Sequence, residues 1–283
     1  MTRDEGAGRQ VEPRAPLRTH LREASGKDEI PTLETEDGRS VSAFREKPKD
    51  AVGLPDAPDQ IYASMGNYVF STEALCDAVT TDSDATDSKH DIGGDIIPRL
   101  VGEGRAQVYD FAQNCVPGAT ERDRGYWRDV GTVDAYYDAN MDLISVDPIF
   151  NLYNREWPIL TARDPMPPAK FVFADPDRSG HAFDSMVSAG VIVSGGEVRK
   201  SVLSPGVFVH SYARVEGSVL MHNVDVGRHA IVRNAIVDKN CQIPEGMVIG
   251  VDPKQDAERF HVTEKGRVLV VPEMLGQQVH QVR

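Results

Sequence analysis

Three short groups of residues have the types and spacing needed to bind a phosphorylated ligand. In Glu46-Lys47-Pro48 the ammonium group would hold a phosphate as a point charge, and the carboxylate would bind sugar hydroxyl groups. Ser64-Met65-Gly66 precedes Tyr68, and the glycine would let a ligand approach the backbone closely. In Trp127-Arg128-Asp129 a carboxylate lies beside an aromatic residue just before an expected helix N-terminus, which suits Mg²⁺ and phosphate binding.

Each group also has a reading that involves no ligand. A Glu-Lys pair before a proline is common on solvated surfaces, and Ser64 and Tyr68 could simply pack within a strand. Asp129 could do no more than help to cap the following helix. The pair His90-Asp91 could contact a sugar, although Asp91 could equally be only a cap. The local sequence therefore leaves both kinds of reading open.

The elements that would carry these groups follow from hydrophobic patterning and from capping residues. The turn dipeptide Asp37-Gly38 precedes a strand that we expect to end at Pro48. Ser71 and Thr132 are expected helix N-caps, because each is followed by an acidic residue in the first helical turn. The pattern predicts strands at residues 63–70, 107–111 and 268–271, and helices at residues 72–79, 91–100, 133–144, 254–260 and 273–275.

Three segments are expected to lack regular structure. Residues 1 to about 30 are polar and show no hydrophobic period, so we expect them to be poorly ordered. The acidic run over residues 80–89 is expected to be flexible. Residues 147–168 hold many prolines and are interpreted as a connector.

A 17-residue repeat near the C-terminus predicts a parallel β-helix. Its aliphatic residues recur at spacings of 6, 5 and 6, a rhythm that no amphipathic helix produces. It fits a chain wound around a triangular prism, with one short strand per face and one inward aliphatic residue per strand. We expect a left-handed β-helix of about three coils over residues 186–250. A sandwich of alternating strands is the alternative, but it would not lock three positions to one period. The expected inward residues are Ile192, Val198, Leu203, Val209, Val215, Leu220, Val226, Val232, Val237 and Ile243.

Composition narrows the class of protein. The chain has 283 residues and a net charge of −13, which argues against nucleic acid or an anionic membrane as the main partner. No apolar run approaches the roughly 20 residues of a membrane span, and the charged N-terminus does not read as a signal peptide. Cys76, Cys115 and Cys241 have no metal-ligand spacing, so we expect reduced thiols in a cytoplasmic protein.

The order of these groups, with a β-helix after them, resembles the bacterial ADP-glucose pyrophosphorylases (glucose-1-phosphate adenylyltransferases) of glycogen synthesis. The resemblance runs from about residue 40 to the C-terminus. The combination of YWRDVGT, a β-helix and IPEGMVIG is specific to that family, whereas EKP is shared across sugar-phosphate nucleotidyltransferases. The matching stretches are FREKP (44–48), ASMGNYVF (63–70), HDIGGDIIP (90–98), YWRDVGT (126–132), NREWPI (154–159), PPAKFV (167–172) and IPEGMVIG (243–250).

The resemblance implies an α/β fold class and a domain order. The expected architecture is the C-terminal part of a Rossmann-like nucleotidyltransferase domain followed by the left-handed parallel β-helix. We expect a poorly ordered segment at 1–32, a partial nucleotidyltransferase domain at 33–146, a connector at 147–185 and the β-helix domain with its tail at 186–283. The family makes ADP-glucose and pyrophosphate from ATP and glucose 1-phosphate with Mg²⁺.

The resemblance also implies roles for the residues that match its motifs. Lys47 would be catalytic and would hold the phosphate of glucose 1-phosphate, and Asp129 would be catalytic as one of two carboxylates on the metal. The sugar pocket would be lined by Glu46, Ser64, Tyr68, Asp91 and Trp127. Lys239 matches a basic position implicated in binding a phosphorylated activator, although it could equally be a solvated turn lysine. A homotetramer regulated by small phosphorylated effectors is implied for the full-length enzyme.

The resemblance is incomplete at the N-terminal side. The family's Gly-rich nucleotide-binding loop is not found here, so we expect an N-terminally truncated enzyme that is inactive and poorly stable by itself. A non-catalytic regulatory or assembly subunit, or a remnant, is an alternative function. A hexapeptide-repeat acyltransferase is another, with His210, His222 and His229 as candidate catalytic histidines. A nucleotidyltransferase acting on another sugar or base is a further alternative.

Overall fold

The computed structural model describes residues 15–23, 31–35, 38–45, 60–161 and 165–276. The chain divides into two compact units, Met1–Val116 and Pro117–Arg283, which we call the N-terminal and C-terminal units. Among the described residues no helix is both long enough and apolar enough to span a membrane.

The N-terminal unit contains a five-stranded sheet in the order β3-β2-β4-β1-β5. Strand β1 pairs antiparallel with β4 and parallel with β5, while β2 pairs antiparallel with both β3 and β4. The predicted strand after Asp37-Gly38 is confirmed as β3, and its predicted end at Pro48 lies outside the described residues. The strands are β1 (Ala15–Glu23), β2 (Thr32–Thr35), β3 (Val41–Arg45), β4 (Gln60–Tyr68) and β5 (Ala106–Asp110).

Strand β1 corrects the prediction for the N-terminal segment. We expected residues 1–30 to be poorly ordered, and that expectation is wrong for Ala15–Glu23. Leu17, Thr19 and Leu21 alternate with basic residues, a period of two that is typical of a strand. The overall polarity of the segment concealed this short alternation.

The helices of the N-terminal unit begin at the predicted caps. The Ser71 hydroxyl accepts a hydrogen bond from the Ala74 amide at the start of α1 (Thr72–Ser83). This helix runs four residues beyond its predicted end at residue 79, so the acidic run is not flexible from Thr80. A single π-helical turn, η2 (Ile92–Ile96), leads into α2 (Ile97–Gly102). The core of the unit consists of Leu33, Val41, Ala78, Ile96, Ile97, Leu100, Val101 and Ala106.

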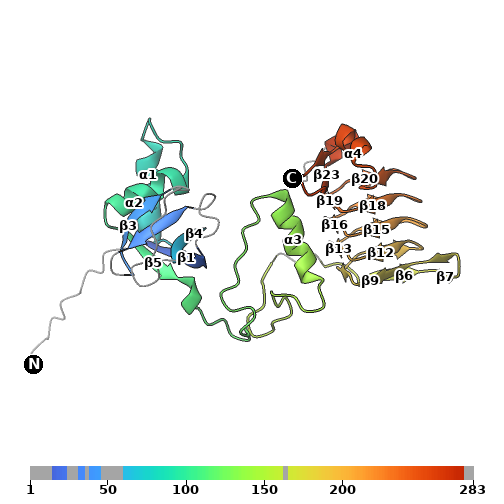
Figure 1. Cartoon of the computed structure of the whole chain (residues 1–283), viewed down its shortest axis with the longest axis horizontal. Helices are drawn as coiled ribbons and strands as arrows, with labels where there is room; N and C mark the ends of the chain where they lie inside the picture. The colour runs from blue at the N-terminus through green and yellow to red at the C-terminus, as the bar shows by residue number, and fades with distance from the viewer. Residues whose placement is uncertain (1–14, 24–30, 36–37, 46–59, 162–164, 277–283) are drawn as a thin grey trace, which may run out of the picture. The chain divides into compact units, whose positions relative to one another are not determined.

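The C-terminal unit is a parallel β-solenoid with three faces, which appears in Figure 1 as a ladder of short strands. Its sheets have the orders β10-β13-β16-β19-β23-β22, β20-β17-β14-β11-β6 and β21-β18-β15-β12-β9. Their strands are β6 (Lys170–Val172), β9 (His181–Phe183), β10 (Met186–Val187), β11 (Ile192–Ser194), β12 (Glu197–Arg199), β13 (Val202–Leu203), β14 (Phe208–Val209), β15 (Arg214–Glu216), β16 (Val219–Leu220), β17 (Asp225–Val226), β18 (Ile231–Arg233), β19 (Ala235–Val237), β20 (Gln242–Ile243), β21 (Val248–Ile249), β22 (His261–Val262) and β23 (Val268–Val270). The first strands, β6 and β9, precede the predicted start at residue 186.

The predicted 17-residue period sets the register of most coils. Val202 pairs with Val219, and Val219 pairs with Ile236, each 17 residues further on. Nine of the ten predicted inward residues are buried, from Val198 to Ile243. The prediction for Ile192 is wrong, because Val193 is the fully buried residue there and pairs with Val209. That coil is one residue short, so extending the 17-residue period backward selects the outward neighbour. The left-handed turn of the coil stays a prediction.

Helix α3 (Val133–Leu143) belongs to the C-terminal unit. Its buried Tyr137 packs in a cluster with Val202, Val219 and Ile236 of the solenoid. The predicted apolar face of this helix is confirmed, since Val133, Tyr136, Met141 and Ile144 border the same cluster. The predicted domain boundary after residue 146 therefore does not coincide with the division between the compact units. The remaining elements are η3 (Phe111–Gln113), β7 (Ala174–Asp175), β8 (Arg178–Ser179), α4 (Pro253–Arg259) and η4 (Pro272–Leu275).

Candidate functional site

Ser64 and Tyr68 lie together at the end of strand β4. The two hydroxyl oxygens are 3.2 Å apart, and the Ser64 hydroxyl also accepts a hydrogen bond from the Gly66 amide. Gly66 has a φ of +66°, a conformation that residues with a side chain rarely adopt. The glycine lies where the pairing of β4 with β1 shifts register, and this local irregularity accompanies the approach of the two hydroxyl groups.

Asp91 joins this pair from a different element. Its carboxylate accepts a hydrogen bond from the Gly94 amide at the start of η2, so its predicted role as a cap is confirmed. A Cβ atom placed on Gly93 would lie 3.5 Å from Asp91 Oδ1 and 3.7 Å from the Tyr68 hydroxyl oxygen. Gly93 thus lies between these two polar groups. The structure brings together Ser64, Tyr68 and Asp91, three of the residues predicted to bind a sugar.

Sequence reasoning missed Asp95, which completes this capping arrangement. Its Oδ2 accepts hydrogen bonds from the amides of Lys89 and Asp91, at 3.1 and 3.0 Å. The carboxylates of Asp91 and Asp95 thus satisfy backbone amides at the same helix start, much as the two side chains of a capping box do. An acidic residue four positions after a capping aspartate is the signal that could have identified it.

Asp129 lies in the C-terminal unit, just before helix α3. Its Oδ1 accepts a hydrogen bond from the Gly131 amide at 3.0 Å, and the side chain is exposed. The N-cap is Thr132, whose hydroxyl accepts from the Ala135 amide, as the sequence predicted. Asp129 is therefore held in a turn outside the helix and is not its N-cap, which leaves its carboxylate accessible to a ligand. Trp127, two residues earlier, is partly buried.

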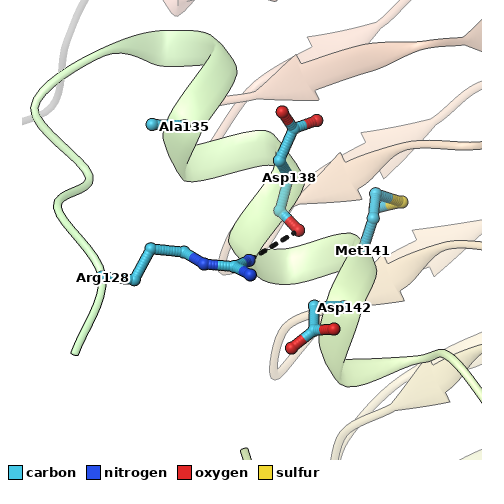
Figure 2. A pocket seen from close by; sticks show the side chains of 5 residues that line it. All are labelled: Arg128, Ala135, Asp138, Met141 and Asp142. Atoms are coloured by element: carbon cyan, nitrogen blue, oxygen red, sulfur yellow. Dashed lines mark hydrogen bonds between the residues drawn. The ribbon is translucent and has the colours of Figure 1, made fainter. Parts of the chain in front are cut away.

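The segment with Asp129 is tied to α3 by Arg128. Its guanidinium donates to the Asp138 carbonyl oxygen at 3.3 Å, as Figure 2 shows. A shallow hollow lies beside this contact and is lined by Arg128, Ala135, Asp138, Met141 and Asp142. The hollow includes neither Trp127 nor Asp129, so it does not extend to the predicted ligand-binding residues of this segment.

Helix α3 is held in turn by the solenoid. The Tyr137 hydroxyl donates to the Gly217 carbonyl oxygen at 2.6 Å, and burial raises the pKa of this phenol. The Thr263 hydroxyl donates to Asp134 at 2.8 Å, and the Lys265 ammonium lies 3.2 Å from Asp138. These contacts were missed from the sequence, because they join residues at least 80 positions apart.

Other predicted residues have simpler surroundings. Glu46 and Lys47 lie outside the described residues. Lys239 is exposed at a solenoid corner, where its amide donates to the Asp238 carboxylate at 2.8 Å. Of the histidines considered for acyl transfer, His210 pairs with Asp225 at 3.1 Å, and His229 stacks on Tyr212 with 4.9 Å between ring centroids.

The donor set for a metal is small. Within the part of the chain that the structure describes, no group of three or more His, Cys, Asp or Glu side chains could enclose an ion. Mg²⁺ is commonly held by only one or two carboxylates together with substrate phosphates and water. The exposed carboxylate of Asp129 fits that kind of site, and it does not fit an all-protein cage.

Comparison with known proteins gives the same two-part picture. Residues 31–146 match the model of the nucleotidyl transferase family, and residues 167–270 match that of the GlmU-like C-terminal hexapeptide family. The chain is 59% identical over 235 residues to the glucose-1-phosphate adenylyltransferase of Frankia casuarinae, a match that covers 83% of this chain and 57% of the relative. It is 55% identical over 267 residues to that of a Parafrankia strain and 52% identical over 266 residues to that of Corynebacterium jeikeium. Each of these two matches covers 94% of this chain and 63% of the relative, so the chain spans about three fifths of the length of these relatives.

Proposed function

We propose that this chain, a homologue of the glucose-1-phosphate adenylyltransferases, binds glucose 1-phosphate for ADP-glucose synthesis. The observation that carries the proposal is that Tyr68 and Asp91 both lie beside Gly93, while the Ser64 hydroxyl contacts that of Tyr68. Two hydroxyl groups and a carboxylate close together suit the hydroxyl groups of a hexose, because the Ser and Tyr hydroxyls can donate or accept hydrogen bonds and the carboxylate can accept them. The sequence stretches that contain these three residues are among those that resemble the family.

The proposed reaction joins ATP and glucose 1-phosphate. A phosphate oxygen of the sugar phosphate attacks the α-phosphorus of ATP, the bond from that phosphorus to the bridging oxygen of the β-phosphate breaks, and pyrophosphate leaves. Protein catalysis of such a transfer consists mainly of positioning and charge neutralisation. Lys47 would bind the sugar phosphate, and Glu46 and Trp127 would complete the contacts to the sugar.

Mg²⁺ is proposed as the metal, with Asp129 as one of its ligands. The accessible carboxylate, held in place by the Gly131 amide, fits a site that substrate phosphates complete. When bound, the ion would neutralise charge on the phosphates. The chain's own contribution is to hold this carboxylate in the turn that precedes a helix packed on the solenoid.

The wider setting is also a proposal. We infer a cytoplasmic, homotetrameric enzyme that uses ATP and glucose 1-phosphate as substrates and responds to small phosphorylated effectors. Lys239, exposed at its corner, is the proposed effector contact in this chain.

Calorimetric titration of the 283-residue chain tests this proposal. Glucose 1-phosphate should bind at least tenfold more tightly than glucose, because the contact proposed for Lys47 is with the phosphate. Lys47→Ala should remove most of that difference, whereas Lys239→Ala should leave it unchanged. Equal binding of the phosphorylated and free sugars by the wild-type chain would contradict the proposed role of Lys47. In any preparation that turns over, Lys47→Ala should raise the KM for glucose 1-phosphate more than that for ATP.

A further inference from the structure

A buried carboxylate outside the proposed sugar contacts organises the segment that precedes Asp91. The Asp82 side chain, on the last turn of α1, is only 10% exposed. Its Oδ1 accepts a hydrogen bond from the Ser88 hydroxyl at 2.7 Å, and its Oδ2 lies 3.0 Å from His90 Nδ1. The Ser88 hydroxyl in turn accepts from the His90 amide at 2.9 Å. One aspartate therefore engages both the side chain of His90 and, through Ser88, its backbone.

The backbone of His90 needs such support. Its φ is +60°, in the left-handed region that residues with a Cβ atom adopt at a steric cost. Conformations of this kind persist where surrounding contacts over-determine them, and they are concentrated at functional sites. The imidazole contact with Asp82 is a contact that a glycine at this position could not make. It therefore offsets the steric cost of the turn.

The turn directs the chain into the helix start at Asp91. The amides of Lys89 and Asp91, directly before and after His90, both donate to the Asp95 carboxylate. The backbone is thus held from both sides of the left-handed residue. Asp91 follows immediately and presents its own carboxylate beside Gly93.

We propose that Asp82 and His90 are positioning residues, which hold the left-handed turn that places the Asp91 carboxylate in the proposed sugar site. The inference rests on the proposed function, because it assigns to these two residues the placement of a ligand contact. Neither residue has to touch the ligand. The imidazole ring orients the backbone, and Asp82 orients the ring.

The ionisation of Asp82 is consistent with this role. The hydrogen bonds from His90 and then from Ser88 hold the pKa of its carboxyl below the ordinary value, against the opposing effect of burial. The Arg99 guanidinium adds a smaller electrostatic effect in the same direction. Asp82 is therefore a carboxylate at neutral pH and accepts hydrogen bonds with both oxygens.

Amide hydrogen exchange by NMR, paired with glucose 1-phosphate titration, tests the inference in the 283-residue chain. Asp82→Asn should accelerate exchange of the Lys89, Asp91 and Gly94 amides by about tenfold and weaken glucose 1-phosphate binding by a similar factor. Asp87→Asn is the matched control, since Asp87 is an exposed aspartate of the same loop. It should change neither quantity.

A second substitution separates positioning from general stabilisation. Glycine adopts a positive φ without steric cost, so Asp82→Asn combined with His90→Gly should recover part of the lost affinity. Ser88→Ala is a milder variant that keeps the His90 contact and should weaken binding about threefold. It serves if Asp82→Asn fails to fold.

The outcomes separate this inference from the proposed function. Unchanged Gly94 exchange in Asp82→Asn, or in Ser88→Ala if the former does not fold, would overturn the inference. Faster exchange with unchanged affinity would also overturn it and leave the proposed function standing. If the wild-type chain does not bind glucose 1-phosphate, the proposed function fails, and the role assigned to Asp82 and His90 fails with it.

Discussion

The two units of this chain hold their side chains by different means. In the C-terminal unit a repeated coil places one aliphatic residue on each face, and similar environments recur every 17 residues in most coils. In the N-terminal unit the polar residues of the candidate site lie at a strand end and a helix start. Those residues are held by individual hydrogen bonds between side chains and backbone amides. Repetition thus builds the scaffold, and irregular local contacts build the site.

The difference shows why the gathered sugar-site candidates lie outside the repeated coils. A repeated strand offers the same chemistry in every coil, whereas a sugar requires several different groups at one point. Gly66 and His90, with φ of +66° and +60°, bend the backbone beside those groups. The solenoid contributes instead by holding α3, the helix that follows Asp129.

The largest expected difference is in thiol reactivity, between a cysteine in the solenoid core and two exposed cysteines. Burial, followed by the nearby carboxylates of Asp238 and Glu273, raises the pKa of Cys241 to about 12. Compared with the ordinary value of 9.0, this leaves roughly a thousandfold less thiolate near pH 8. Cys76 and Cys115 are exposed. A colorimetric disulfide reagent should therefore label two thiols in the native chain and three in urea.

The sign of the accompanying pH effect follows from linkage. A thiol whose pKa is raised in the folded state ionises first in the unfolded chain, so stability falls as the pH rises above 9. Rapid labelling of all three thiols in the native chain would contradict the packed solenoid core.

A core truncation gives the next largest effect. Leu220 is fully buried inside the solenoid, and Leu220→Ala should lower the free energy of unfolding by about 3 kcal/mol. Leu160 is 86% exposed, so Leu160→Ala is the matched control and should change stability by less than about 0.5 kcal/mol. Urea unfolding followed by circular dichroism measures both. Equal losses of stability in the two variants would contradict the assignment of Leu220 to a packed solenoid core.

A single hydroxyl tests whether α3 belongs to the solenoid. Tyr137→Phe removes the donor to the Gly217 carbonyl and should cost about 1 kcal/mol. Tyr153 is 78% exposed, so Tyr153→Phe should have no measurable effect. Hydrogen exchange measured by mass spectrometry should show faster exchange in α3 for Tyr137→Phe, with strands β2 to β5 unaffected. If Tyr137→Phe instead reduced protection only in β2 to β5, the assignment of α3 to the C-terminal unit would be contradicted.

Much of the scaffold could be predicted from the sequence, because repeated burial leaves a repeated pattern. The aliphatic period from Val198 to Ile243 predicted the solenoid, and Ser71 and Thr132 predicted the starts of two helices. The prediction for Ile192 was wrong because one coil is a residue shorter, and a period cannot reveal where it is interrupted. Strand β1 was missed because its alternation is brief and mostly basic.

The site was predictable only in part. Motifs identified Ser64, Tyr68 and Asp91, and the structure shows that two distant elements bring them together. The contacts of Asp82 and Ser88 with His90 were not predictable, since they depend on a left-handed residue in a polar loop. The ion pair of Lys265 with Asp138 joins positions 127 apart, a separation at which local sequence patterns carry no information.

The most direct test of the account is a ¹⁵N NMR titration of this chain with glucose 1-phosphate. We expect the amides of Gly66, Gly93 and Gly94 to shift in a saturable way, while those of solenoid glycines such as Gly206 and Gly246 should not. Tyr68→Phe and Asp91→Asn should weaken that response. Saturable shifts confined to the solenoid, with Gly66 and Gly93 unmoved, would contradict the assignment of the sugar-phosphate site.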